Sequence, residues 1–381
     1  MLNKKTLQYP AWAEINLSNI KSNFLRLKRK AGKGLKVLAA VKAHAYGHGM
    51  LEVSRQLEKC KVGYLGVASV SEALALRQGK IKTPILVMGN VYDQNQIKQA
   101  INARISLTVA DLSGALNLSR IAAEKKVKVH IKVDTGMGRI GIWHQEAYAH
   151  IIKIFKMKNL LIEGIFTHFP SADTDIDFTK QQVIIFKKLI ERLNQNNIYI
   201  PLIHGANSSA IFQLKNYNPE LFNMVRPGLM LYGMYPSPAI KTKSRLNLKP
   251  VLQLKSRVVF LKTVDKGRSI SYGRTYRAKT KTKIATVSIG YADGYSRALS
   301  NKAQVLIKGK LLPVVGRICM DQLMVDIGLS SKVKVGDIVT LIGSQQKKTI
   351  FSETLASLCN TIPYEITCGI SARVKRVFKK H

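Results

Sequence analysis

A repeated alternation of short apolar segments with helical segments between residues 36 and 233 limits most strongly how this chain can fold. Several apolar segments, such as 37–41, are apolar throughout, which is typical of strands buried on both faces of a sheet. The segments between them, such as 71–78 and 178–194, carry apolar residues at helical spacing. Eight strands are predicted, beginning near Lys36, Val62, Pro84, Ile105, Val127, Leu161, Tyr199 and Phe222. Eight βα units predict an α/β fold of the (β/α)8 type, a TIM-like barrel.

The pattern changes from about residue 246 onward, where strand-like segments are separated by Gly and Asp turns. Segments 256–263, 283–289 and 337–342 are the clearest of these predicted strands. Residues 235–244, with two prolines and small polar residues, interrupt both patterns and are the predicted link. A chain of 381 residues is long enough for two domains. We therefore expect a barrel over residues 1–240 and a mostly β domain over residues 241–381.

The charge of the chain is unusual, since 61 Lys and Arg residues face 22 Asp and Glu residues and give a formal net charge of +39. Such a charge invites a role in binding nucleic acid or an acidic membrane. The basic residues are spread along the whole chain, however, with only modest clusters at 279–283 and 374–380. We find no zinc-finger spacing, basic leucine zipper or aromatic RNA-binding signature. A solvated, lysine-rich surface without a specific nucleic-acid partner is the preferred interpretation, and a polyanion-binding role is the alternative.

The surroundings in which the protein works can also be inferred from the sequence. No apolar run approaches the ~18 residues that span a bilayer. Residues 1–10 lack the apolar stretch of a secretion signal, and the four cysteines show no Cys-x-x-Cys spacing. We expect a cytoplasmic protein with reduced cysteines, no membrane segment and no metal site.

Lys42 is the first candidate for chemistry, because it directly follows the apolar segment 37–41 and precedes a glycine-containing loop. This position is the carboxyl end of a predicted barrel strand, where catalytic groups gather in this fold. A lysine partly shielded there can lose its proton and condense with an aldehyde. The alternative is an ordinary surface lysine.

Two loops after the last two predicted strands, 204–209 and 224–233, are rich in small residues that leave backbone amides accessible. In (β/α)8 barrels these loops commonly bind phosphate, because amides and hydroxyls meet the anion there. A plain turn remains the alternative for each loop.

At this point the chain resembles the alanine racemases. Segment 40–49 is similar to the cofactor-lysine signature of that family, and further similar segments follow in order through both predicted domains: 134–141, 167–169, 204–208, 224–233, 271–274, 289–295, 315–321 and 362–365. Two small departures are His44, where the family more often has Asn or Asp, and Pro170, where a small residue is usual. Neither removes a reactive group.

The resemblance implies that pyridoxal 5'-phosphate is held through Lys42 as a Schiff base. The residues implied to surround this cofactor are Tyr46, His168, Asn207, Ser208, Arg226, Gly228, Leu229 and Tyr364. Arg226 is expected to face the pyridine nitrogen, and an arginine does not give up its proton easily. The ring would then be a weaker electron sink, which suits a racemase because it restrains transamination.

The resemblance also implies two catalytic bases, Lys42 for the α-proton of D-alanine and Tyr272 for that of L-alanine. In the family the tyrosine comes from the partner subunit of a head-to-tail homodimer. His168 would relay the charge of Arg226 toward this tyrosine and help the phenol act as a base. The remaining implied roles concern Arg139 as a ligand of the substrate carboxylate, Met320 as a lining residue of the pocket, and Lys132 as a lysine that is carbamylated in many members.

The implied activity is interconversion of L-alanine and D-alanine, which supplies D-alanine for peptidoglycan synthesis. A racemase of broader specificity that acts on serine is the nearest alternative, although the bulk of Tyr364 and Met320 favours a small side chain. A decarboxylase of the same architecture, or a barrel that binds the cofactor without catalysis, is a more distant alternative.

Overall fold

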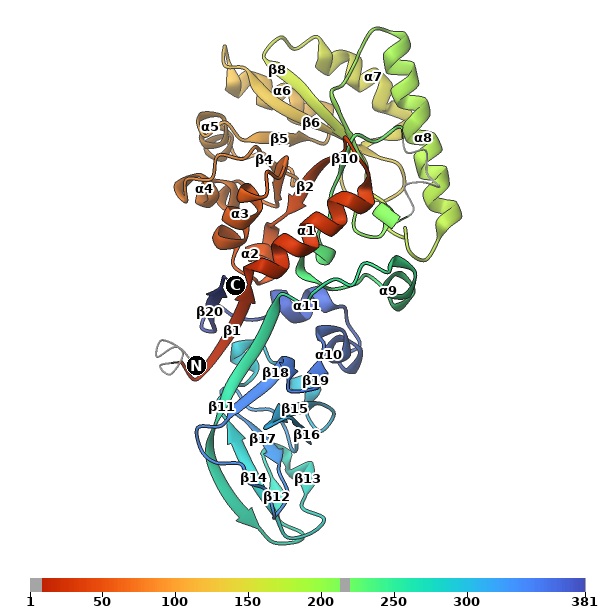
Figure 1. The fold of residues 1–381 in the computed structure, drawn as a ribbon. Coiled ribbons are helices and arrows are strands. Elements are labelled where there is room, and N and C mark those ends of the chain that lie inside the picture. The colour runs from red at the N-terminus through yellow and green to blue at the C-terminus, as the bar shows by residue number, and fades with distance from the viewer. Residues whose placement is uncertain (1–8, 213–219, 381) are drawn as a thin grey trace. The chain divides into compact units, whose positions relative to one another are not determined.

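A computed structural model describes residues 9–212 and 220–380 of the chain. The N-terminal residues 1–8, on which the expectation of a missing secretion signal partly depends, lie outside the described residues. The chain forms two compact units (Figure 1). The barrel unit comprises Ile20–Ala45 and Met50–Lys249, and the β unit comprises the described parts of Met1–Asn19, Tyr46–Gly49 and Pro250–His381. Each unit is described by itself.

Eight parallel strands form the closed sheet of the barrel unit, which confirms the predicted fold. They are β2 (Lys36–Ala40), β3 (Tyr64–Val67), β4 (Ile85–Val87), β5 (Ser106–Val109), β6 (Val127–Asp134), β8 (Leu160–Phe166), β9 (Leu202–His204) and β10 (Met224–Val225). Neighbours along the chain pair in sequence order, β10 pairs with β2, and a pairing of Leu107 with Val129 joins β5 to β6. The short strand β7 (Ile142–Trp143) adds to β6.

Helices follow most strands of the barrel unit. In chain order, the helices up to residue 249 are α1 (Leu17–Ala31), α2 (Lys42–Tyr46), α3 (Met50–Lys59), α4 (Val70–Gln78), α5 (Gln94–Asn102), α6 (Leu112–Ala122), α7 (His144–Phe155), α8 (Ile176–Gln195), η2 (Ala210–Phe212), η4 (Leu229–Tyr232) and α9 (Pro238–Ser244). Five of them begin where an N-cap side chain accepts a hydrogen bond from a backbone amide: Ser69, Asp93, Asp111, Asp175 and Ser237. Such caps satisfy an amide that the first turn leaves without an intrahelical partner.

Buried side chains from several strands fill the barrel. Leu38, Tyr64, Leu86, Leu202 and Met224 form one cluster of buried residues drawn from β2, β3, β4, β9 and β10. A barrel filled in this way is a packed core and not a pore, so chemistry is left to the strand ends.

The β unit is mostly antiparallel sheet, which confirms the predicted second domain. Its strands are β1 (Ala11–Asn16), β11 (Leu252–Val264), β12 (Ser269–Ile270), β13 (Tyr276–Arg277), β14 (Thr282–Val287), β15 (Gln304–Ile307), β16 (Lys310–Pro313), β17 (Leu323–Asp326), β18 (Ile338–Gln345), β19 (Lys348–Ile350) and β20 (Lys375–Lys379). Its helices are the short turns η5 (Tyr272–Arg274), η6 (Tyr291–Asp293) and η7 (Arg297–Leu299), with α10 (Ser352–Leu358) and α11 (Pro363–Cys368).

Strand β1 belongs to the β unit, which differs from a simple division of the chain near residue 240. It pairs antiparallel with β11 and parallel with β20. Its buried Glu14 also accepts hydrogen bonds from Lys255 Nζ at 2.9 Å and Lys379 Nζ at 2.6 Å. The backbone of β1 and the carboxylate of Glu14 therefore bind residues from the later part of the chain. The local apolar pattern does not reveal this pairing.

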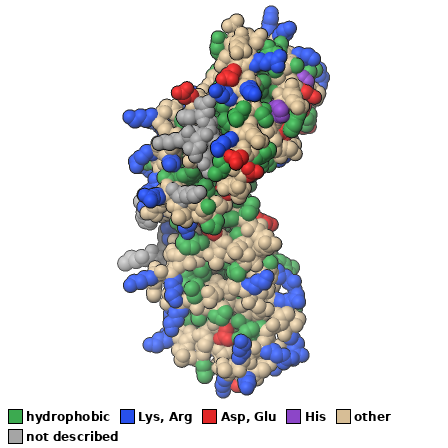
Figure 2. All heavy atoms as spheres, turned by 90° about the vertical axis from the view of Figure 1, so that its right-hand side faces the viewer, with side chains coloured by type: hydrophobic (Ala, Val, Ile, Leu, Met, Phe, Trp, Pro, Cys, Tyr) green, Lys and Arg blue, Asp and Glu red, His purple; other side chains and the backbone are tan. Residues whose placement is uncertain are grey.

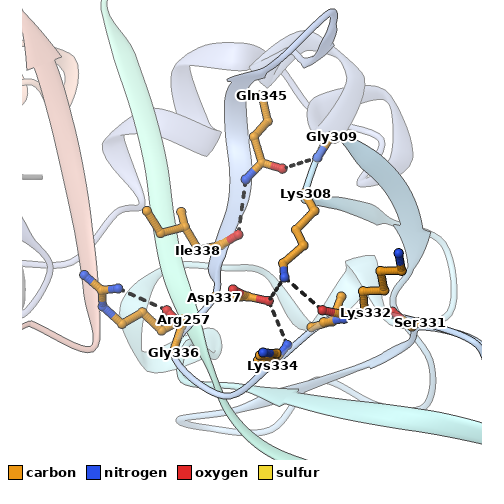
Figure 3. Close-up of polar contacts among 11 residues, drawn as sticks. Arg257, Lys308, Gly309, Ser331, Lys332, Lys334, Gly336, Asp337, Ile338 and Gln345 are labelled. Atoms are coloured by element: carbon orange, nitrogen blue, oxygen red, sulfur yellow. Dashed lines mark hydrogen bonds and ion pairs between the residues drawn. The ribbon is translucent and has the colours of Figure 1, made fainter. Parts of the chain in front are cut away.

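A set of polar contacts fixes the loop that leads into β18 (Figure 3). Lys308 Nζ lies 3.1 Å from Asp337 Oδ2 and donates to the carbonyl of Lys332 at 2.8 Å, while Asp337 Oδ2 also accepts from Lys334 N at 2.7 Å. Gln345 accepts from Gly309 N and donates to the carbonyl of Ile338. These contacts join β18 to the turn after β15 and have a structural role.

Lysine and arginine side chains are scattered over both units on the face shown in Figure 2. No helix within residues 9–212 and 220–380 is long and apolar enough to cross a membrane. The four cysteines all fall within these ranges, and they form no disulfide.

Candidate active site

Lys42 lies just beyond the carboxyl end of β2, in the position predicted for it. The chain turns sharply after it, because Ala43, His44, Ala45 and Tyr46 all have left-handed φ values between 51° and 56°. A run of non-glycine residues in this conformation is strained, and strain of this kind concentrates at functional sites. Within the barrel unit, Glu72 Oε1 holds the turn by accepting from Ala43 N at 2.7 Å. Its Oε2 accepts from Ala68 N at 2.7 Å, so Glu72 couples the loops after β2 and β3.

Asp134, the last residue of β6, organises the loop that carries Arg139. Its two carboxylate oxygens accept hydrogen bonds from four successive backbone amides, those of Gly136, Met137, Gly138 and Arg139, at 2.8 to 3.2 Å. Burial favours the neutral carboxyl, but these amides and the nearby Lys132 outweigh it and lower the pKa of Asp134. Asp134 is thus an ionised structural residue of the loop.

Lys132 is almost completely buried within the barrel unit, where its Nζ donates to the carbonyl of Val133 at 2.9 Å. Burial, followed by the charges of Arg226 and Arg139, lowers the pKa of Lys132 to about 7. A substantial fraction of this lysine is therefore an unprotonated amine at neutral pH.

Arg226 follows β10 and is held by contacts on both of its terminal nitrogens. Nη2 donates to the carbonyls of Thr167 at 2.8 Å and Gly205 at 3.1 Å, and it lies 3.1 Å from His168 Nδ1. Nη1 lies 2.9 Å from His204 Nδ1. Burial and the charge of Arg139 lower the pKa of Arg226 to about 9, so the guanidinium stays protonated at neutral pH.

Positive charge gathers around His168, which follows β8. Burial lowers the pKa of His168 well below its usual value, and Arg226, Lys132, Arg139 and Lys42 lower it further, in that order. His168 is therefore a neutral imidazole that accepts from Arg226 through Nδ1. Lys42, Arg139 and Arg226 follow β2, β6 and β10, and Lys132 lies on β6, so five of the predicted site residues share one electrostatic environment.

A hydrogen bond joins the loops after β9 and β10, which are predicted to bind phosphate. Ser208 Oγ accepts from the amide of Gly228 at 3.0 Å, and Leu229, the first residue of η4, is buried. Asn207 holds the first of these loops, since its Nδ2 donates to the carbonyl of Phe169 at 2.9 Å and its Oδ1 accepts from Ala210 N at 3.0 Å.

The other predicted site residues belong to the β unit. The rings of Tyr46 and Tyr364 lie 5.6 Å apart. Tyr272 follows Ser271, which has a left-handed φ of 65°, and its side chain is 71% exposed. Met320 is 53% exposed. Tyr272 and Met320 are large side chains that this unit leaves open to solvent.

The chain is similar to known proteins over nearly its whole length. The models of the alanine racemase N-terminal and C-terminal domains match residues 15–236 and 251–378. An alanine racemase of Halothermothrix orenii is 44% identical over 98% of this chain and 98% of its own length, and one of Methanococcus maripaludis is 44% identical over 98% and 99%.

Two solved structures are also similar to the model. The alanine racemase of Clostridium difficile 630 has a TM-score of 0.91 at 41% identity, covering 98% of this chain and 96% of its own. That of Bacillus anthracis with bound L-Ala-P has a TM-score of 0.91 at 35% identity, covering 98% and 95%. These similarities place the chain in the class of pyridoxal-phosphate-dependent racemases, which are isomerases. Within that class, the chain belongs to the alanine racemase family.

Proposed function

We propose that this protein interconverts L-alanine and D-alanine, using pyridoxal 5'-phosphate as its cofactor and Lys42 and Tyr272 as its two bases. The observation that carries the proposal is the position of Lys42 before a left-handed turn at the carboxyl end of β2, in a chain whose two domains match those of alanine racemases. The relatives with the same two domains are alanine racemases, and one of them was solved with L-Ala-P. In a cell, the product would supply D-alanine for peptidoglycan.

The residues present fit an anionic cofactor that carries a reactive carbonyl. Ser208 Oγ already accepts from Gly228 N, so its own O–H can donate to a phosphate oxygen. Tyr46 and Tyr364, together with Asn207 and Leu229, are the further residues that would hold the phosphate and its surroundings. Lys42 would hold the cofactor covalently. When bound, pyridoxal phosphate supplies an electron-withdrawing ring that stabilises negative charge at the substrate's Cα.

Arg226 would control how strongly that ring withdraws electrons. Its guanidinium remains protonated and meets two carbonyl oxygens and two histidine nitrogens. A residue that keeps its own proton leaves the cofactor's ring nitrogen without one. Stabilisation of the carbanion is then limited, which favours return of the proton to Cα over transamination.

The two bases would act on opposite faces of the planar substrate carbon. Lys42 Nζ takes the α-proton of D-alanine while Tyr272 Oη donates one to the other face, and the reverse sequence converts L-alanine. Arg139, positioned by Asp134, would bind the substrate carboxylate. Met320 and Tyr364 would restrict the pocket to a small side chain, which favours alanine over serine.

The experiment that tests this function is a racemisation assay on the purified protein loaded with pyridoxal phosphate. We expect rapid conversion of L-alanine to D-alanine, slower conversion of serine, and no release of carbon dioxide. A protein that binds the cofactor and leaves alanine unchanged would refute the proposal.

Lys132 is proposed to carry a carbamate, because its pKa of about 7 leaves an amine that can add to carbon dioxide at neutral pH. A carbamate would carry a negative charge, so Arg226 and Arg139, whose positive charges act on this lysine, would attract it and no longer repel it. We expect ¹³C-bicarbonate to produce a carbamate signal in the carbon NMR spectrum of the native protein.

The Lys132→Ala variant should lack this signal. A Lys128→Ala variant, which changes an exposed lysine on the same strand, should retain it. A spectrum that is the same in Lys132→Ala and native protein would contradict the assignment.

The active form is proposed to be a head-to-tail homodimer in which Tyr272 of one chain serves the site of the other. The motivation is that Tyr272 and Met320 are exposed in the single chain, whereas a catalytic phenol needs a site that excludes water. Inactive Lys42→Ala and Tyr272→Phe proteins should therefore restore activity when mixed. One site of each heterodimer has both bases, so random exchange should return about a quarter of native activity.

The measurement is the racemisation rate after the mixed proteins have exchanged subunits, with each variant alone as the control. Labelled subunits would verify exchange by mass spectrometry. If heterodimers form and the rate stays at the level of the single variants, the shared site is wrong.

A further inference from the structure

A chain of four polar side chains runs through the barrel unit from Arg226 to Glu163. Arg226 Nη1 lies 2.9 Å from His204 Nδ1, and His204 Nε2 lies 2.8 Å from His130 Nδ1. His130 Nε2 then lies 3.6 Å from Glu163 Oε2. His204, His130 and Glu163 lie on β9, β6 and β8, and Arg226 directly follows β10, so the series runs along neighbouring strands of the barrel. Both histidines are completely buried.

The arginine is compatible with only one arrangement of the protons on two neutral histidines. A guanidinium can only donate, so His204 Nδ1 must accept from Arg226 and must lack a proton. A neutral His204 then carries its proton on Nε2 and donates it to His130 Nδ1. His130 in turn carries its proton on Nε2, which faces Glu163. Burial is the first cause that lowers the pKa of each histidine, which agrees with two neutral rings.

Glu163, the last of these four polar side chains, is an ionised carboxylate. Its Oε1 accepts from Lys128 Nζ at 2.7 Å, and its Oε2 accepts from Ser106 Oγ at 3.0 Å. Burial opposes ionisation, but contacts with His130, Lys128 and Tyr64 outweigh it and lower the pKa of Glu163 far below its usual value. Within the described residues, His130 Nε2 has no partner at hydrogen-bond distance, so this carboxylate is the charge that its N–H faces.

Strand β8 is shaped to receive the two histidines. Gly164 leaves room for His130, because a Cβ at this position would lie 2.3 Å from His130 Nδ1. Phe166 stacks on His204 with ring centroids 4.9 Å apart and an interplanar angle of 4°. The strand thus supplies the carboxylate, the space and the aromatic face from Glu163, Gly164 and Phe166. Gly164 and Phe166 restrict the orientations of the two histidine rings, and Glu163 faces the proton of His130.

We propose that Glu163 and His130 are positioning residues that hold His204 in the tautomer that accepts from Arg226. If the proton of His130 moved to its Nδ1, that N–H would donate to His204 Nε2. The proton of His204 would then lie on the Nδ1 of His204. Two N–H donors, from His204 and Arg226, would then face each other at 2.9 Å. The carboxylate prevents this by favouring a proton on His130 Nε2. The consequence for catalysis rests on the proposed function, in which the guanidinium of Arg226 meets the cofactor.

The first test locates the protons directly, by neutron crystallography of the perdeuterated protein with bound pyridoxal phosphate. We expect deuterium on Nε2 of both His130 and His204 and none on their Nδ1 atoms. Deuterium on Nδ1 of either ring, or on all four nitrogens, overturns the proposal. These positions can be read whether or not the protein racemises alanine, so a failure of the proposed function would be recognised separately.

The second test compares the loss of the Glu163 carboxylate with the loss of its ion pair with Lys128. Glu163→Met removes both, and we expect kcat to fall by about 10- to 100-fold, the scale of an interaction between an N–H group and a charge, with little change in KM. Glu163→Gln removes the charge and keeps an oxygen, so its kcat should fall by no more than that of Glu163→Met. Lys128→Met removes the exposed partner of the ion pair and serves as the matched control, with kcat unchanged.

An unchanged kcat in Glu163→Met would show that Glu163 does not hold the proton of His130, and it would overturn the proposal. A loss in Lys128→Met as large as that in Glu163→Met would do the same. Circular dichroism and thermal unfolding of each variant with bound cofactor would identify a folding defect. In that case, the neutron structure of the native protein decides.

Discussion

Replacing Lys42 by alanine is expected to abolish racemisation, with a fall in kcat of more than about 10⁴-fold. The variant loses the base that serves D-alanine, which alone contributes about 10² to 10⁴. It also loses the amine that binds the cofactor covalently, so the substrate must react with cofactor that is poorly held. The measurement is the racemisation rate at saturating pyridoxal phosphate, together with the mass of the protein after borohydride reduction.

Lys36→Ala is the matched control, because Lys36 is the exposed first residue of the same strand. It should keep native activity and should retain the reduced cofactor as added mass. A Lys42→Ala protein that racemises alanine within tenfold of the native rate, or that still binds the cofactor covalently, would contradict the assignment.

Replacing Tyr272 by phenylalanine is expected to lower racemisation by about 10² to 10⁴, the usual contribution of a positioned acid-base group. The ring remains and only the phenol is lost, so the cofactor should still bind to Lys42 and be reduced there by borohydride. The value of kcat/KM should fall equally in both directions, since the two enantiomers have equal free energy.

Tyr199→Phe is a suitable control, because Tyr199 is as exposed as Tyr272, at 70% against 71%, but belongs to the barrel unit. Its rate should be that of the native protein. An unchanged rate in Tyr272→Phe would remove this tyrosine from the mechanism.

The barrel could be predicted from the sequence because its signal is local and repeated. The expected starts at Lys36, Val127 and Leu161 fall within one residue of the observed strands β2, β6 and β8. Lys42 could be found for the same reason, since the end of an apolar strand marks the reacting edge of the fold.

Contacts between distant segments could not be predicted in the same way. Strand β1 has no local pattern that names β11 and β20 as its neighbours. Glu72 lies in a helix and gives no sign that it holds the turn after Lys42. Glu163 and His130 meet only through the register that pairs His130 with Gly164. Tyr272 lies in an ordinary Ser-Tyr-Gly turn, and the family resemblance alone singled it out.

Exchange of the α-proton with heavy water tests the two-base assignment most directly, because exchange with retained configuration reports one face of the substrate at a time. In Tyr272→Phe protein, Lys42 can still remove and return a proton on its own face. We therefore predict measurable exchange into D-alanine and almost none into L-alanine. Equal loss of exchange from both enantiomers would contradict the assignment of Tyr272 as the base for L-alanine.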